Sequence, residues 1–330
     1  MLKRLVRILV ILLLVIGLAG GAVLFWGWER FHAPGPLAES THVLVKRGQG
    51  LIEIGRQLAQ AGVIFDEYTF FLGARWGEPG RSLKAGEYAF PAHVPAAGVV
   101  AMMRRGETVI RKVTVAEGLT VAQVMALLRS AEGLEGALEE TPLEGSLLPE
   151  TYHFSWGDSR ETMLQRMRGA MRQTLDGLWS GRRADLPLKS KEDALILASV
   201  VERETGLPEE RPHVAAVFLN RLRQGMKLQS DPTVIYGLSN GAGVLDHALT
   251  RDDLAKPHPY NTYVIEGLPP GPIANPGKAS LAAVLNPADS EDLYFVADGS
   301  GGHVFARSLS EHNRNVARWR QIEKQRKQGE

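Results

Sequence analysis

An uncharged stretch at residues 8–28 constrains this chain more than any other feature of its sequence. As a helix with a rise of ~1.5 Å per residue it would be about 31 Å long, matching the ~30 Å hydrocarbon core of a membrane. The run is longer than the apolar part of a usual signal peptide. It therefore predicts a transmembrane helix. The small residues 18–22 also fit a cleavage site, so a cleaved signal peptide is the alternative.

The two ends of this stretch differ in charge and in aromatic content. Three basic residues precede it: Lys3, Arg4 and Arg7. Basic residues before a span favour a cytoplasmic amino terminus. Trp26 and Trp28 lie where the helix would leave the membrane, as in an aromatic belt. Residues 1–30 are thus predicted to be a cytoplasmic tip and a single-pass anchor, with the rest of the chain outside.

The charge balance and the lack of cysteine exclude several classes of protein. The 330 residues include 38 Lys and Arg against 37 Asp and Glu, a net charge of +1. A dedicated nucleic-acid binder would show a basic excess, so we expect no nucleic-acid partner. The absence of Cys removes thiolate metal sites and cysteine nucleophiles, and the histidines lack metal-binding spacing. We expect no metal and no cofactor.

A strand, a glycine turn and an amphipathic helix occur twice after the anchor, at residues 43–61 and again at 113–131. A shorter similarity links residues 86–90 to residues 150–154. We interpret both as a degenerate duplication of a small α/β unit. A pattern this common also recurs by chance, and that alternative stays open. The first unit resembles a carbohydrate-binding module of LysM type.

Two glutamates, Glu202 and Glu204, end a mostly apolar helix that is predicted to begin at Ser190. At ~100° per residue their side chains lie about 160° apart, too far to act as a close pair. A carboxyl against apolar walls has a raised pKa, as a general acid near neutral pH requires. The alternative is structural, with the two acids paired to a neighbouring basic residue: Arg203, Arg211 or Arg221.

Three later segments are polar, aromatic or rich in Gly and Pro and show no regular period: 227–237, 257–263 and 267–287. We predict an irregular site wall there rather than core, and the Asn, Gln, Thr and Tyr side chains suit a hydroxyl-rich ligand such as a sugar. Residues 293–306 predict a β-hairpin, and a charged helix is expected from Ser310 onward.

Six ordered motifs run through this second half, at residues 198–205, 218–222, 228–233, 260–263, 267–273 and 294–297. Together with the anchor and residues 147–152, they closely resemble the endolytic murein transglycosylases, the MltG or YceG-like family. The resemblance covers nearly the whole chain and is loose only at residues 247–255.

The resemblance implies a peptidoglycan lytic transglycosylase. It would cleave the β-1,4 bond between N-acetylmuramic acid and N-acetylglucosamine within glycan strands, leave a 1,6-anhydro end and terminate glycan elongation. One carboxyl suffices because the C6 hydroxyl of the substrate attacks, whereas a hydrolase needs two. The essential acid of the family motif falls on Glu202. Six further residues are assigned to orienting it and to binding glycan: Glu204, Gln229, Asp231, Thr233, Asn261 and Tyr263.

The predicted fold class is α+β, with a transmembrane helix, a small LysM-like α/β module and a mixed α/β catalytic domain. The expected divisions are 1–30 anchor, 31–40 linker, 41–107 LysM-like peptidoglycan-binding module, and 108–330 YceG-like catalytic domain, made of a second unit (108–185) and a core (186–330). The resemblance also implies a bacterial inner-membrane location with the catalytic domain on the periplasmic side. Penicillin-binding proteins and other cell-wall synthesis components are the implied protein partners.

Two other functions compete with this one. A non-catalytic tether would bind peptidoglycan and position other enzymes without cutting it. A soluble aminodeoxychorismate lyase conflicts with the anchor and lacks the lysine context of pyridoxal chemistry.

Overall fold

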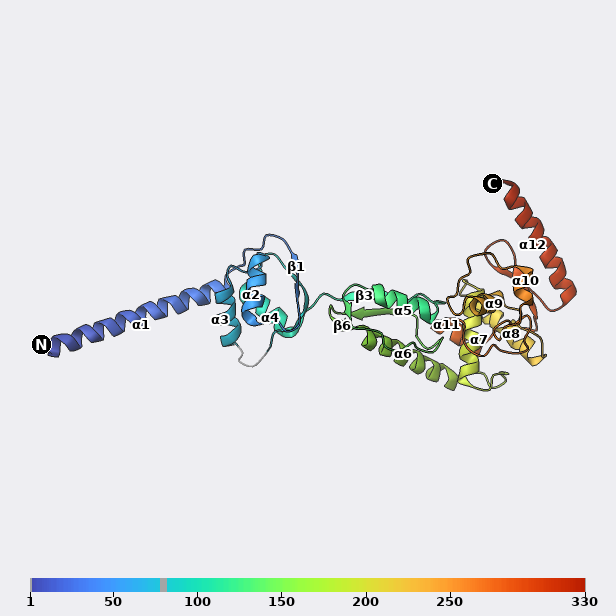
Figure 1. Cartoon of the computed structure of the whole chain (residues 1–330), viewed down its shortest axis with the longest axis horizontal. Helices are drawn as coiled ribbons and strands as arrows, with labels where there is room; N and C mark the ends of the chain where they lie inside the picture. The colour runs from blue at the N-terminus through green and yellow to red at the C-terminus, as the bar shows by residue number, and fades with distance from the viewer. Residues whose placement is uncertain (1, 78–81, 330) are drawn as a thin grey trace. The chain divides into compact units, whose positions relative to one another are not determined.

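The computed structural model describes residues 2–77 and 82–329 of the chain. It divides into two compact units (Figure 1). The first comprises Met1–Arg111 and His153–Asp158, and the second comprises Lys112–Tyr152 and Ser159–Glu330. The predicted mixture of helices and strands, with an apolar helix at the amino terminus, is confirmed.

The first unit begins with the long helix α1, Leu2–His32. By length and composition the part from Lys3 to His32 is able to cross a membrane. The apolar side chains from Leu5 to Trp26 are exposed rather than packed into a core, so among the described residues none covers this part of α1. Its last turns pack against α3.

A two-stranded antiparallel sheet forms the centre of the first unit. Strands β1, Thr41–Val45, and β2, Gly86–Phe90, pair so that Val43 faces Tyr88. Three helices pack on it: α2 Leu51–Gln60, α3 Glu67–Gly77 and α4 Ala96–Arg105. The core consists of side chains with no exposed surface, among them Leu58, Phe70, Tyr88, Phe90, Val99 and Met103.

The segment expected to be a linker is packed onto this unit. Gly35 donates a backbone hydrogen bond to His93 (3.1 Å), and His93 donates one to the carbonyl oxygen of Leu37 (2.8 Å). Leu37 is buried. A side chain at position 35 would meet the Val94 carbonyl oxygen at 2.3 Å, so only glycine allows this close approach. The chain therefore passes from α1 into β1 along the surface of the unit.

A related order of elements follows. It consists of β3 Arg111–Thr114, α5 Val121–Ser130, β4 Leu134–Glu135, β5 Thr151–Phe154, β6 Asp158–Ser159 and α6 Arg160–Ser180. Two short strands, β4 and β6, are added, and among the described residues of this stretch no helix corresponds to α3. Strand β3 pairs with β5, as β1 pairs with β2, and β4 pairs with β6.

Matching hydrogen bonds support the predicted duplication. The Tyr88 hydroxyl donates to the Lys84 carbonyl oxygen (2.7 Å), and the Tyr152 hydroxyl donates to the Leu148 carbonyl oxygen (2.8 Å), each four residues back. The backbone amides of these two acceptor residues form a second matching pair, with the carbonyl oxygens of Met103 (3.1 Å) and Met167 (3.2 Å). Chance recurrence of a sequence pattern does not explain equivalent side-chain contacts.

The remainder of the second unit is a helical cluster with a hairpin. Its core is formed by α6, α7 Lys191–Glu204, α8 Arg211–Arg223 and α11 Lys278–Leu285. Two short helices, α9 Asp231–Leu238 and α10 Arg251–Ala255, lie between α8 and α11 in sequence. The predicted hairpin is confirmed as β7 Tyr294–Ala297 with β8 His303–Ala306, and α12 Leu309–Gly329 follows it.

The expectation of an irregular site wall is wrong for two stretches. Helix α9 occupies most of residues 227–237, since Pro232 stands in its first turn, where proline starts a helix rather than breaking it. Helix α11 belongs to the core, with Leu281 and Val284 fully buried. It is apolar on nearly every side, so it shows no amphipathic period in the sequence.

Candidate active site

Helix α7 carries both glutamates and is fixed at each end. The Ser190 hydroxyl caps it by accepting a hydrogen bond from the Asp193 amide (3.1 Å). Its apolar middle is buried, and the Ser199 hydroxyl there accepts a bond from the amide of Ile273 (3.0 Å). The helix stops at Glu204 because Thr205 is extended. The two acids thus lie in the last turn, held by a rigid element.

The Glu202 carboxylate is enclosed by protein and fully engaged. Its Oε1 accepts a hydrogen bond from Arg211 (3.0 Å), and its Oε2 accepts one from the Gly277 amide (2.8 Å). The side chain of Glu202 is 4% exposed and that of Arg211 is 9% exposed. This buried ion pair is one of the structural alternatives that the sequence left open.

Arg211 joins this pair to the second copy of the repeat. The same Nη2 atom that contacts Glu202 also donates to Glu117 Oε2 (2.8 Å). The glycine turn of the repeat packs here, with Gly118 bonded through its amide to Asn275 (3.0 Å) and through its carbonyl oxygen to Arg203 (3.3 Å). Two carboxylates thus share one guanidinium at the junction of α7, α8 and the turn.

Glu204 is in a different electrostatic situation. Its Oε1 accepts a hydrogen bond from the Ser230 hydroxyl (2.5 Å). Burial, together with the nearby charge of Asp231, raises the pKa of the Glu204 carboxyl to about 7, against the smaller opposing effect of the Ser230 bond. The residue keeps some exposed surface. Glu204 therefore has a buried carboxyl with a pKa of about 7, in a residue that is half-buried as a whole.

A cluster of hydroxyl groups positions Ser230. The Ser230 amide donates to the Thr262 hydroxyl (2.9 Å), and the Thr233 hydroxyl donates to the Ser230 carbonyl oxygen (2.6 Å). The two threonine hydroxyls are 2.9 Å apart. All three residues are buried. Since every hydroxyl has a fixed partner, the Ser230 side chain is held in place beneath Glu204.

Asp231 and Tyr263 form the outer side of this cluster. The Tyr263 hydroxyl donates to Asp231 Oδ1 (2.5 Å), while burial and that bond raise the pKa of the tyrosine. Asp231 and Gln229 are exposed. Gln229 has a positive φ of 54°, which turns the chain sharply before α9. An exposed carboxylate and a half-buried phenol thus lie near Glu204, and the exposed Gln229 directly precedes Ser230 in the chain.

The predicted supporting residues divide into two groups. Thr233 and Asn261 are buried and lack the access that glycan binding needs. Asn261 donates to the carbonyl oxygens of Leu254 (3.0 Å) and Lys256 (2.8 Å), so its role is to shape the loop after α10. Ser230, Thr262 and Arg211 were not among the predicted site residues. Ser230 and Thr262 lie inside the motifs, where only their contacts reveal a role.

A histidine and a third glutamate fix the hairpin beside this site. His303 bonds to Glu210 through both its amide (2.7 Å) and its Nδ1 (2.7 Å), and Thr205 donates to the same carboxylate (3.2 Å). These bonds lower the pKa of Glu210, although burial opposes them. The hairpin is thereby tied to the end of α7. Within residues 2–77 and 82–329 no three His, Asp or Glu side chains form a metal-binding group.

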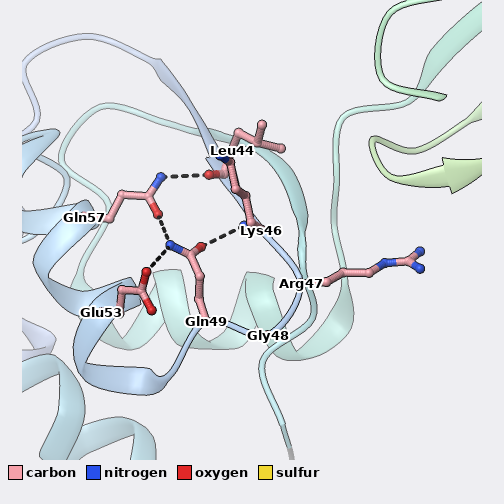
Figure 2. Close-up of a pocket in the computed structure, with 7 residues that line it drawn as sticks. All are labelled: Leu44, Lys46, Arg47, Gly48, Gln49, Glu53 and Gln57. Carbon is pink, nitrogen blue, oxygen red and sulfur yellow. Dashed lines mark hydrogen bonds between the residues drawn. The ribbon is translucent and has the colours of Figure 1, made fainter. Parts of the chain in front are cut away.

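The first unit has a separate polar pocket, drawn in Figure 2 and lined by Leu44, Lys46, Arg47, Gly48, Gln49, Glu53 and Gln57. Gln49 is at its centre, accepting a bond from the Lys46 amide (2.7 Å) and donating to Glu53 and Gln57 (3.2 Å each). Gln57 donates to the Leu44 carbonyl oxygen (2.7 Å). Arg47 points away from this amide cluster. The pocket is thus lined by the amides of Gln49 and Gln57, one carboxylate and two basic residues, Lys46 and Arg47.

Known proteins are similar to this chain in sequence. The endolytic murein transglycosylase of Bacillus subtilis (strain 168) is 39% identical over 175 residues, 52% of this chain and 47% of that protein. That of Streptococcus pneumoniae serotype 2 is 28% identical over 323 residues, 83% of this chain and 57% of that protein. The chain thus spans about half the length of these curated relatives.

The crystal structure of a YceG-like protein from Listeria monocytogenes is 29% identical, with 84% of this chain and 99% of that chain covered and a TM-score of 0.49. The sequence pattern of the YceG-like family matches residues 43–318. That span includes both copies of the repeat, the two glutamates of α7 and the hairpin. The chain therefore belongs to the YceG-like family.

Proposed function

We propose that this chain is a membrane-anchored peptidoglycan lytic transglycosylase. The observation that carries the proposal is the Glu204 carboxyl, whose pKa burial raises to about 7, in a residue that is half-buried as a whole. Such a group is protonated often enough near neutral pH to act as a general acid. The substrate class follows from the relatives, both of which are named endolytic murein transglycosylase.

One carboxyl is enough for the proposed reaction on the β-1,4 bond between N-acetylmuramic acid and N-acetylglucosamine. The acid gives its proton to the glycosidic oxygen as the bond from that oxygen to C1 of the muramic acid breaks. The C6 hydroxyl of the same sugar then bonds to C1, and its proton passes to the carboxylate. The product ends in 1,6-anhydromuramic acid, no water is consumed, and the carboxyl is regenerated.

The geometry favours Glu204 over Glu202 as this acid. Glu202 was expected to be the catalytic residue, but both of its oxygens accept hydrogen bonds from protein groups and it is paired with Arg211. To donate a proton it would first have to give up that ion pair. Within the described residues, Glu204 has a hydroxyl partner on Oε1 and none on Oε2, and the nearby carboxylate of Asp231 suits the positive charge that develops on C1.

The composition of the reaction products tests this proposal. Incubation of the full chain with purified peptidoglycan in ¹⁸O-labelled water is expected to release fragments with anhydro ends and no ¹⁸O, because the attacking oxygen comes from the sugar. Mass spectrometry of the new chain ends measures the fraction of anhydro ends and their ¹⁸O content. Heat-denatured protein is the control. Reducing ends carrying ¹⁸O would identify a hydrolase, and the absence of new ends would identify a non-catalytic tether.

The anchor and the first unit complete the proposal. Helix α1 would span the bacterial inner membrane once, with its basic end in the cytoplasm and both units on the periplasmic side. The first unit would act as a LysM-like module that holds peptidoglycan in the pocket of Figure 2. Neutral amides suit this role, because the hydroxyl and acetamido groups of a glycan pair with amides without requiring a charge.

Removal of the central amide of the pocket, Gln49, together with its carboxylate, Glu53, tests the module. The full chain carrying Gln49→Ala and Glu53→Ala is expected to bind insoluble peptidoglycan about tenfold more weakly, since one or two hydrogen bonds of about 1 kcal/mol each are lost. Gln60→Ala is the matched control, because Gln60 lies on α2 with Glu53 but outside the pocket. Sedimentation gives the dissociation constants. Equal affinity of the double variant and the control would contradict a role of the pocket in binding.

A further inference from the structure

A long apolar groove runs between the end of α1 and helix α3 within the first unit. Its volume is about 1090 Å³. It is lined by residues 23–28 and 30–32 of α1, by Asp66 before α3, and by α3 residues Tyr68, Thr69, Leu72, Gly73 and Trp76. A groove of this size with mainly aromatic and aliphatic walls calls for an apolar occupant.

Helix α3 contributes one exposed face to this groove. Tyr68, Leu72 and Trp76 recur every four residues, so they lie on one side of the helix. Their exposed fractions are 69%, 46% and 68%. The opposite side is buried in the unit, with Phe70 at 0% and Ala74 at 6%. Helix α3 is thus anchored through its inner face while three large side chains point outward.

Helix α3 is held at one position along α1 because several contacts join the two helices. Arg30 donates to Asp66 (3.1 Å) and stacks over the ring of Phe65 at 4.5 Å. Phe31 packs so closely on Gly73 that a side chain there would meet its ring at 2.3 Å. Helix α3 is thus held against the last turns of α1 by an ion pair, by a cation–π contact and by the packing of Phe31 on Gly73.

These contacts determine how deep α3 would lie in a membrane that α1 spans. The uncharged stretch of α1 ends at Trp28, and the groove reaches back to Val23, about 7 Å deeper at ~1.5 Å per residue. The headgroup region on each side of a bilayer is about 5–8 Å thick. The exposed face of α3 therefore lies at the level of the headgroups and the first acyl carbons, where Trp and Tyr are favoured.

We propose that α3 is a membrane-interface helix and that phospholipid headgroups and acyl chains of the outer leaflet fill the groove. This inference rests on the anchoring proposed above and concerns how the first unit lies on the bilayer. The lipid is chosen as occupant because the groove continues the lipid-facing surface of α1. Two contacts with the membrane, one spanning and one lying in the interface, would restrict the tilt of the unit and keep its sheet close to the bilayer surface.

Single-cysteine labelling tests this inference, because the chain has no native cysteine to remove. The full chain is reconstituted in phosphatidylethanolamine–phosphatidylglycerol vesicles with a nitroxide at Leu72→Cys, at Leu13→Cys within α1, or at Ile110→Cys. Ile110 is the matched control, since it is an apolar residue of the same unit that is 62% exposed and outside the groove. Electron paramagnetic resonance then compares collisions with oxygen, which enriches in lipid, and with a water-soluble nickel chelate.

We expect collisions with oxygen to exceed those with nickel several-fold at positions 13 and 72, and the reverse at position 110. A water-exposed label at position 72 with a lipid-exposed label at position 13 overturns the interface helix and leaves the anchor intact. A water-exposed label at position 13 overturns the anchor itself. A label at position 72 that neither reagent reaches shows that protein covers the groove, which overturns lipid as its occupant.

Discussion

The Glu204→Gln variant is expected to cut peptidoglycan about 10²–10⁴-fold more slowly than the unmodified chain, the range typical of losing a general acid. Glutamine keeps the size of the side chain and still accepts the Ser230 hydroxyl, but it has no proton to give to the glycosidic oxygen. The rate of formation of anhydro ends under single-turnover conditions is the measurement. Peptidoglycan binding should be unchanged, because the rest of the cluster remains in place.

Glu202→Gln is the matched control, since it changes the other acid of the same helix turn. Its rate is expected to fall by less than about tenfold, because the proposed proton donor is intact. If Glu202→Gln abolished activity and Glu204→Gln did not, the assignment of the two acids would be reversed. If both variants kept full activity, neither glutamate would be the acid.

The pH dependence gives an independent check on Glu204. Its carboxyl must be protonated at the start of the reaction, and burial raises its pKa to about 7. The value of kcat/KM should therefore be constant at pH values below that pKa and fall about tenfold per pH unit above it. The residual activity of Glu204→Gln should lack this descending limb. A profile that falls only at a much higher pH would contradict the proposal.

Arg211→Met should show the second large effect, a loss of about 3–5 kcal/mol in the free energy of unfolding of the second unit. The arginine balances the charge of Glu202, whose side chain is 4% exposed, and it also contacts Glu117. Without it, Glu202 remains a buried carboxylate with only the Gly277 amide as partner. Urea unfolding of the full chain in detergent, followed by tryptophan fluorescence, measures the change.

A double variant separates lost charge balance from lost packing. Arg211→Met with Glu202→Gln removes the buried charge together with its partner, so most of the lost stability should return. Arg211→Lys keeps the charge but not the planar guanidinium that contacts two carboxylates, and an intermediate loss is expected. If Arg211→Met alone lost less than about 1 kcal/mol, the network would not be stabilising the junction of α7, α8 and the repeat.

Patterns with a clear period were reliable guides to this fold. The apolar run predicted α1, the repeated strand–glycine–helix pattern predicted both α/β units, and the motif before Ser310 predicted the hairpin. The elements that were missed have no such period. Helix α11 is buried on nearly all sides, and α9 is short and begins with Asp231 and Pro232. A pattern-based analysis takes both for loops.

Only part of the candidate active site could be predicted from the sequence. Local spacing is sufficient to place Glu202 and Glu204 on one helix and far apart around it. The motifs that carry Asp231 and Tyr263 were identified through the resemblance to a known family. Local spacing does not distinguish a threonine that reaches solvent from one that supports Ser230. Burial and partner choice depend on residues that are distant in the chain, and no single motif contains them.

The sequence alone determined that this chain has an apolar helix long enough to cross a membrane, a strand–glycine–helix pattern that occurs twice and two glutamates at the end of one helix. These are local properties, set by side-chain polarity and by spacing along the chain. Only the tertiary structure decided the difference between the two acids. Arg211 and the Gly277 amide engage both oxygens of Glu202, whereas burial raises the pKa of the Glu204 carboxyl to about 7 against the opposing effect of its Ser230 bond. Charge partners and desolvation arise when distant segments pack together, so the chemistry of a carboxyl is fixed only in the folded chain.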